Sequence, residues 1–202
     1  NGFNQWYAFD LDRKNYLKTG KFFVDYLSTS SDPRLSFSIA KNGAGNYVGN
    51  AANDQTTLST SYIGSAYATP TSAVGMVTYA EAKFIEAEAK FRLSQNSKPA
   101  LEAAIAASVL KITGTAANPA FIASATGTVS LANILQQKYV ALFLTMEPYN
   151  DYRRTGFPAL IPNQSSNTKL IPLRLPTPLE ERLYNSNATV VSNVTTPLWW
   201  DK

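Results

Sequence analysis

The sequence contains no cysteine and no histidine among its 202 residues. Their absence excludes disulfide bonds, zinc sites of the usual kind, haem ligation, and Cys-His or Ser-His-Asp catalysis. It also removes the side chain that normally titrates near neutral pH. An enzyme with this sequence would have to rely on carboxylates, lysine or tyrosine.

Long hydrophobic runs and a concentrated charge of one sign are also missing. The longest apolar stretch, Val140–Leu144, is far shorter than the roughly 20 residues that a membrane helix needs. The net charge is +4, and the lysines and arginines are scattered, so we expect no nucleic-acid partner. Hydrophobic residues make up 45% of the chain, which is enough for a folded core.

The composition divides the chain into three regions. Residues 1–76 are rich in Asn, Ser, Thr, Gly and Tyr and are expected to form long irregular loops. Residues 77–147 carry helical periodicity and are expected to form a helical core. Residues 148–202 contain seven of the eleven prolines, whose spacing excludes a long helix and favours an irregular tail that wraps over the helices, with one short helix near 179–184.

Two neighbouring segments of the middle region predict a helical hairpin. The first helix, over 78–94, begins at a capping box formed by Thr78 and Glu81. Its exposed side carries opposite charges four residues apart, which stabilise a helix. Because both segments are amphipathic and joined by a short turn, we expect them to pack antiparallel, as in tetratricopeptide-like repeats.

The second and third helices follow from the same kind of pattern. The second covers 98–113, with Ser97 as its expected cap and Gly114 as its end. The third covers 129–147 and is expected to stop at Pro148. The predicted fold class is therefore mainly α, with tetratricopeptide-like helical hairpins and long irregular loops. The side chains predicted to be buried are Phe84, Phe91, Ile105, Leu135, Leu142 and Phe143.

Four segments, taken in order, are similar to one known family. They are Asp32-Pro33-Arg34, the helix TYAEAKFIEAEA over 78–89, QKYVALF over 137–143 running on to NDYRRTGFP over 150–158, and IPLRLP over 171–176. Together with the closing Trp199-Trp200-Asp201, this set resembles the C-terminal half of the SusD/RagB family of Bacteroidetes outer-membrane lipoproteins.

The resemblance implies both a structure and a function. It implies the C-terminal portion of a SusD-like α-α superhelix, in which a helical scaffold supports a loop-rich ligand face. It implies non-catalytic capture of a glycan or other nutrient at the cell surface, without a cofactor, for delivery to a SusC-type TonB-dependent transporter. It also implies a lipid anchor to the outer membrane through an N-terminal region absent from this chain. We accordingly expect the chain to be a fragment of a longer protein.

Aromatic and amide side chains of the first region are the candidate ligand contacts. Aromatic faces stack on the C–H faces of sugar rings, while amides and carboxylates hydrogen-bond the hydroxyls. The candidates are Tyr47, Tyr62, Tyr67, Asn50 and Asp54, with Trp6 and Tyr7 as a second aromatic pair. The alternative for each tyrosine is that it holds its loop against the core. Trp199-Trp200 is expected to dock the chain end rather than bind a ligand.

The charged motifs have structural explanations that compete with functional ones. Arg153 or Arg154 is expected to pair with a helix carboxylate such as Glu81 or Glu88, and the segment 32–34 is expected to be structural. A glycosidase would need two carboxylates across a cleft, and no persuasive pair stands out, so we predict no catalytic residues and no metal site. The alternative function is a tetratricopeptide-like adaptor that binds protein segments.

Overall fold

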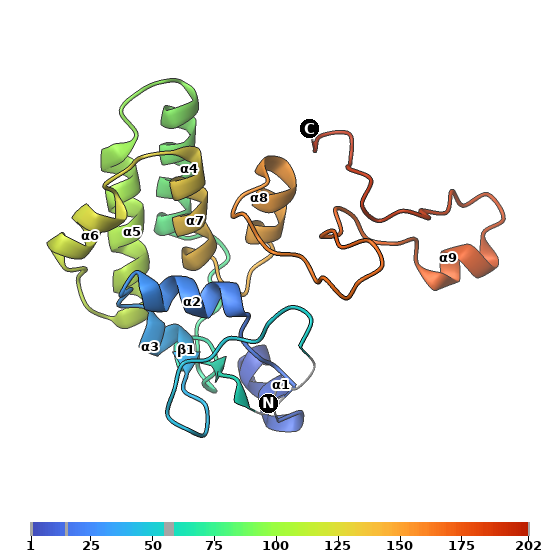
Figure 1. Ribbon diagram of the computed structural model, residues 1–202, viewed down its shortest axis with the longest axis horizontal. Helices are drawn as coiled ribbons and strands as arrows, with labels where there is room; N and C mark the ends of the chain where they lie inside the picture. Colours follow the sequence, from blue (N-terminus) through green and yellow to red (C-terminus); the bar gives the residue numbers. More distant parts are fainter. Residues whose placement is uncertain (1, 15, 55–58, 202) are drawn as a thin grey trace.

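Three helices from the middle of the chain pack side by side and form the body of the molecule (Figure 1). The computed structural model describes residues 2–14, 16–54 and 59–201. The predicted mainly α fold is confirmed, since within these residues helices far outweigh the two strands of two residues each. In chain order the elements are α1 (Gln5–Asp12), α2 (Lys21–Thr29), α3 (Leu35–Ser38), β1 (Ile39–Ala40), β2 (Tyr62–Ile63), α4 (Tyr79–Arg92), α5 (Lys98–Thr113), α6 (Pro119–Ala125), α7 (Leu131–Ala141), α8 (Glu147–Thr155) and α9 (Leu179–Tyr184).

Helix α4 forms where the capping motif and the apolar spacing predict it. The Thr78 Oγ1 accepts a hydrogen bond from the Glu81 amide at 3.1 Å, which satisfies one of the free amides at the helix start. On the outer side, Lys90 Nζ lies 2.6 Å from Glu86 Oε1, one of the expected pairs four residues apart. The predicted helix is therefore confirmed to within two residues at its C-terminal end.

Helix α5 packs against α4 across a short turn, as the hairpin prediction requires. Gly114 ends α5 in the left-handed conformation, with φ of 72°, a position where glycine has no Cβ penalty. The prediction that the Ser97 side chain caps α5 is wrong. Ser97 already has helical backbone angles, and the Lys98 amide instead donates to Asn96 Oδ1 at 3.3 Å.

Helix α7 ends earlier than the sequence predicts, at Ala141 rather than near residue 147. The chain turns over the next five residues, and Leu144 takes a positive φ of 66°, which a continuous helix does not allow. Pro148 therefore does not stop α7. It lies in the first turn of α8, where its missing amide hydrogen costs no hydrogen bond.

The main core lies between α4, α5 and α7. Its buried side chains are Phe84, Ala87, Ala100, Leu101, Ala104, Ile105, Val109 and Ile134. Two predicted core residues are less buried than expected. Phe91, in the last turn of α4, remains 36% exposed, and Phe143 is half-buried because it lies in the turn after α7 rather than within it. The Phe143 ring stacks on Phe23 with centroids 4.1 Å apart.

The first region is more regular than its composition predicts. Its described part contains three helices, and α2 buries Phe23, Val24 and Leu27 in a second core cluster with Ile39 and Val140. The short strands β1 and β2 pair antiparallel with Ile39 opposite Ile63. This region therefore packs under the body through α2 and α3 rather than surrounding it as loops (Figure 1).

A buried arginine fixes this region to the helices. Arg34 has no exposed surface, and its guanidinium contacts Asp32 through Nε at 2.9 Å and Nη2 at 2.6 Å. It also donates to Ser108 of α5 and to Gln137 of α7, both at 2.9 Å. The structural role expected for the segment 32–34 is confirmed, because a buried charge must be fully paired.

The proline-rich tail leaves the body after α8 and extends away from it, with α9 at its far end (Figure 1). It is held at α8, where Tyr149 donates to the Pro172 carbonyl at 2.8 Å and the Arg153 guanidinium lies 4.7 Å from the Trp200 ring. The predicted short helix at 179–184 is confirmed as α9. The prediction that the tail wraps over the helices is wrong for the stretch around α9.

Candidate functional site

A cavity of about 400 Å³ opens at the end of the body where α4 begins, α5 ends and the turn between α7 and α8 passes. The segment 66–78 forms another wall, and α1 contributes Trp6. Cavities of this volume are typical of small-molecule sites. The lining combines the aromatic side chains of Trp6 and Tyr67 with several charged groups, so it offers both stacking surfaces and hydrogen-bonding groups.

The charged groups gather here because of how the helices run. In an antiparallel hairpin, the first turn of one helix lies beside the last turn of the other. Glu81, in the first turn of α4, and Lys111, in the last turn of α5, therefore share one end of the hairpin and both line the cavity. Glu147, in the first turn of α8, is the third charged residue of the lining.

The aromatic side of the cavity is fixed by contacts from Asn4 and Phe143. The Asn4 side chain accepts from the Trp6 amide at 2.9 Å and donates to the Ser72 carbonyl at 2.9 Å, which ties α1 to the segment 66–78. The Tyr67 ring packs edge-on against Phe143 with centroids 5.4 Å apart, and burial raises the pKa of Tyr67 to about 12. Tyr67 therefore contributes a neutral, fixed ring at neutral pH.

Of the seven ligand residues that the sequence predicts, Trp6 and Tyr67 line this cavity. Tyr7 lies beside Trp6 on α1, where its ring packs edge-on against Phe3 with centroids 5.7 Å apart. The structure thus brings together residues 61 positions apart in the sequence, and it does so through the contacts of Asn4 with the segment 66–78.

The other four predicted residues lie where three chain segments cross. The Asn50 amide donates to the Thr19 carbonyl at 2.8 Å, and the Asn50 side chain donates to the Asp54 carbonyl at 2.9 Å. Tyr62 carries the Lys18 ammonium 3.6 Å from its ring centroid. Tyr47 packs against the second core cluster. None of these four residues is part of the cavity lining.

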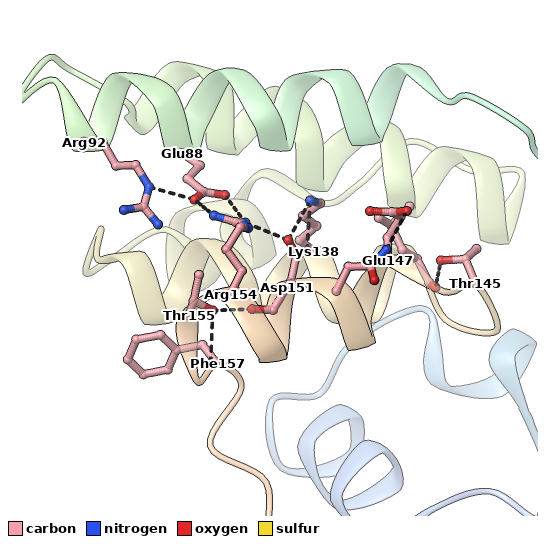
Figure 2. A network of polar contacts seen from close by, with 11 residues as sticks. Glu88, Arg92, Lys138, Thr145, Glu147, Asp151, Arg154, Thr155 and Phe157 are labelled. Carbon is pink, nitrogen blue, oxygen red and sulfur yellow. Dashed lines mark hydrogen bonds and ion pairs between the residues drawn. The ribbon is translucent and has the colours of Figure 1, made fainter. Parts of the chain in front are cut away.

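A second polar cluster joins α4, α7 and α8 (Figure 2). Arg154 binds both Glu88 oxygens through its two terminal nitrogens, with Nη2 2.8 Å from Glu88 Oε2, and contacts Asp151 Oδ1 at 2.7 Å. Lys138 Nζ lies 2.9 Å from Asp151 Oδ2, and Arg92 Nε lies 2.8 Å from Glu88 Oε1. The predicted pairing of one tail arginine with a helix carboxylate is confirmed for Arg154 and Glu88.

The electrostatics of this cluster are those of a structural clamp. Burial raises the pKa of Glu88, but the hydrogen bonds from Arg154 and Arg92 outweigh it and hold the pKa below its usual range. The hydrogen bond to Glu88 in turn raises the pKa of Arg154. Each carboxylate is neutralised by at least two cations, so the cluster fastens α8 to the body. Among the described residues, no group of three or more acidic side chains is placed to hold a metal ion.

The comparison with known protein families decides what kind of chain this is. A family profile named SusD-like_2, described as "Starch-binding associating with outer membrane", matches residues 1–178. The chain belongs to the SusD-like family. No curated protein shows significant similarity to it.

Solved SusD homologues have the same fold as this SusD-like chain. A chitin-binding SusD homologue from Flavobacterium johnsoniae superposes with a TM-score of 0.81 at 20% identity, and the match covers 99% of this chain and 52% of that one. SusD homologues from Bacteroides vulgatus and Bacteroides fragilis give TM-scores of 0.79 and 0.78 at 21% and 20% identity. These matches cover 91% and 100% of this chain, but 49% and 56% of the homologues. The SusD-like chain thus spans about half the length of the solved structures it matches.

Three charged cavity residues of the SusD-like chain, Glu81, Lys111 and Glu147, were not among the ligand residues predicted from the sequence, where Glu81 was considered only as a helix cap and an ion-pair partner. Lys111 could have been found, because the antiparallel hairpin predicted for 78–94 and 98–113 places it beside Glu81. Glu147 could not, because the predicted third helix ran through the turn that precedes α8.

In the part of the chain that the structure describes, no helix is long and apolar enough to cross a membrane.

Proposed function

We propose that this SusD-like chain is part of a non-catalytic protein that captures glycans at the outer membrane, and that the cavity beside Trp6 takes part in binding. The observation that carries the proposal is the combination of an aromatic pair with hydrogen-bonding side chains around a space of about 400 Å³. Sugars present apolar C–H faces and hydroxyls, which match these two kinds of lining. The starch-binding description of the family and the chitin-binding homologue support the choice of ligand.

Calorimetric titration with maltoheptaose and chitohexaose tests the proposal. An aromatic stacking contact contributes on the order of 1 kcal/mol, so we expect Trp6→Ala to weaken binding of the recognised glycan about five- to tenfold. Trp199→Ala is the matched control, because Trp199 is 84% exposed and lies outside the cavity lining. The glycan should be recovered uncleaved. Binding that is equal in wild type and Trp6→Ala, or sustained hydrolysis by repurified protein, would contradict the proposal.

The finer part of the proposal concerns delivery. We propose that the whole protein is lipid-anchored at the cell surface and passes its ligand to a SusC-type TonB-dependent transporter. The outer-membrane association in the family description supports this location. Detergent extraction of outer membranes followed by affinity purification of the protein tests the partnership. Recovery of a transporter of this type is expected, and its consistent absence from the purified material argues against delivery.

Two sequence predictions remain alternatives that the same assays distinguish. Tyr47 and Tyr62 stay predicted ligand contacts, and their alanine variants should weaken glycan binding if a second contact region exists. The tetratricopeptide-like adaptor remains the alternative function. It predicts retention of a protein partner and no retention on a glycan array, which is the opposite of what glycan capture predicts.

A further inference from the structure

The cavity holds a pair of opposite charges that do not pair with each other. Glu81 and Lys111 both line it, yet no hydrogen bond or ion pair reaches the Glu81 carboxylate or the Lys111 ammonium from any residue that the structure describes. The other charged side chains of α4 behave differently. Glu86 lies 2.7 Å from Lys83 and 2.6 Å from Lys90, for example. An unpaired acceptor and an unpaired donor in one cavity leave both groups available to a ligand.

The Lys111 ammonium lies beside Gly75 at the cavity wall. A Cβ atom added to Gly75 would lie 2.9 Å from Lys111 Nζ and 2.9 Å from the Thr78 methyl group. The ammonium therefore lies close against the backbone near residue 75, in space that the glycine leaves open. Thr78, which caps α4, sits between this point and the first turn that carries Glu81.

We infer that Glu81 and Lys111 determine ligand specificity by binding adjacent hydroxyl groups of a neutral sugar whose ring stacks on Trp6. A carboxylate only accepts hydrogen bonds and an ammonium only donates them, whereas a hydroxyl does both. Two neighbouring hydroxyls can thus donate to Glu81 and accept from Lys111 at once. This inference rests on the proposed glycan-binding function and adds the chemical class of sugar to it.

The same charges disfavour acidic sugars. Glu81 and Glu147 contribute two negative charges to the lining and Lys111 contributes one positive charge. A uronic acid would bring a further carboxylate close to this excess of negative charge, and like charges brought together in an interface weaken binding. The cavity therefore fits uncharged, hydroxyl-rich glycans better than oligogalacturonates.

A purely structural role for the two residues makes a different prediction. A carboxylate in the first turn and an ammonium in the last turn both favour a helix through its dipole, whether or not a ligand binds. In that case Glu81→Gln and Lys111→Met would lower the melting temperature slightly and leave glycan affinity unchanged. A binding role changes affinity for the ligand while the melting temperature of the free protein stays nearly constant.

The test is calorimetric titration of wild type, Glu81→Gln and Lys111→Met with maltoheptaose, chitohexaose and oligogalacturonate. Glu102→Gln and Lys98→Met are the matched controls, because this pair lies at the other end of the hairpin, 4.0 Å apart. We expect about a tenfold loss of affinity for the recognised neutral glycan in each cavity variant, none in the controls, and no measurable oligogalacturonate binding.

Two results would overturn the inference and leave the proposed function intact. One is unchanged affinity in both cavity variants when Trp6→Ala weakens binding, and the other is oligogalacturonate binding as tight as that of the neutral glycans. If wild type binds none of the three probes, or if Trp6→Ala has no effect, the proposed function fails together with the inference. Melting temperatures measured on the same samples separate lost binding from lost folding.

Discussion

The body of the molecule buries its large apolar side chains, whereas the tail leaves several of them exposed to solvent. In the body, α4, α5 and α7 bury their apolar residues against one another, and Phe84 and Ile105 have no exposed surface. In the tail, over 157–201, large apolar side chains such as Leu175 and Trp199 stay exposed. The tail nevertheless keeps a defined path, because it is attached to α8 by individual hydrogen bonds and by the stacking of Trp200 on Arg153.

The difference shows how apolar residues that recur at helical spacing contribute to a common core. An apolar residue at every third or fourth position gives each body helix a continuous stripe, and three stripes close one core. The tail has prolines at spacings that prevent such a stripe, so its apolar residues cannot gather on one face. Stability should therefore be concentrated in the body, and the tail should depend on a few contacts at α8.

The largest expected effect is truncation of a body side chain. Phe84→Ala should lower the free energy of unfolding by about 3–5 kcal/mol, because it removes a fully buried ring and leaves a cavity between α4, α5 and α7. Phe91→Ala is the matched control on the same helix, and its loss should be less than half as large. Denaturant unfolding curves measure both, and equal losses would show that burial does not separate these positions.

An intermediate effect is expected where α8, which carries the tail, is fastened to the body. Glu88→Gln should lower the free energy of unfolding at neutral pH by about 1–3 kcal/mol, because it weakens charged hydrogen bonds to Arg154 and Arg92. The pKa of Glu88 lies below its usual range in the folded state. Its stabilising contribution is therefore fully present above the unfolded pKa of about 4.3 and is lost as the pH falls through the folded value.

The pH dependence of the unfolding free energy provides a control for this prediction. Between neutral pH and roughly pH 3, wild type should lose more unfolding free energy than Glu88→Gln, since the variant has no carboxylate to protonate at this position. Glu102→Gln, a surface substitution on α5, should follow wild type across the same range. If Glu88→Gln shows the wild-type pH dependence, Glu88 does not connect α8 to the body in the way its hydrogen bonds indicate.

Much of the body could be predicted from the sequence, because local signals agree there. The Thr78 cap, the Gly114 end and the apolar stripes predict α4 and α5. Outside the body, the pattern at 179–184 predicts α9. Helix α2 was missed because its single stripe is only nine residues long and lies in a polar region. The end of α7 was misplaced because the apolar pattern continues past Ala141 into a turn, and only the tertiary fold sets the positive φ of Leu144.

The candidate site was predictable in part. Aromatic residues were the right kind of candidate, yet nothing in the sequence indicates that Trp6 and Tyr67 line one cavity while Tyr47 and Tyr62 lie elsewhere. That separation depends on hydrogen bonds between distant segments, such as the one from Asn4 to the Ser72 carbonyl. The location of Glu81 and Lys111 at the same end of the hairpin depends only on antiparallel packing, so it follows from the sequence once the hairpin is accepted.

The smallest effect is expected in the tail itself. Trp199→Ala should change the free energy of unfolding by no more than about 0.5 kcal/mol, because the ring is almost fully exposed. Thermal or denaturant unfolding of the variant beside wild type measures the difference. A loss above about 1 kcal/mol would place Trp199 in a folded contact and make the tail more like the body than its exposure indicates.

Arg34 has a consequence for how the molecule opens. Two of its partners, Ser108 and Gln137, lie 74 and 103 residues away along the chain, so separating the first region from α5 or α7 breaks buried charge-assisted hydrogen bonds and leaves polar groups without partners. Opening of the first region alone is therefore disfavoured. Amide hydrogens of α2, α5 and α7 should exchange with solvent in one concerted event, as a single cooperative unit, while those of the tail exchange independently and earlier.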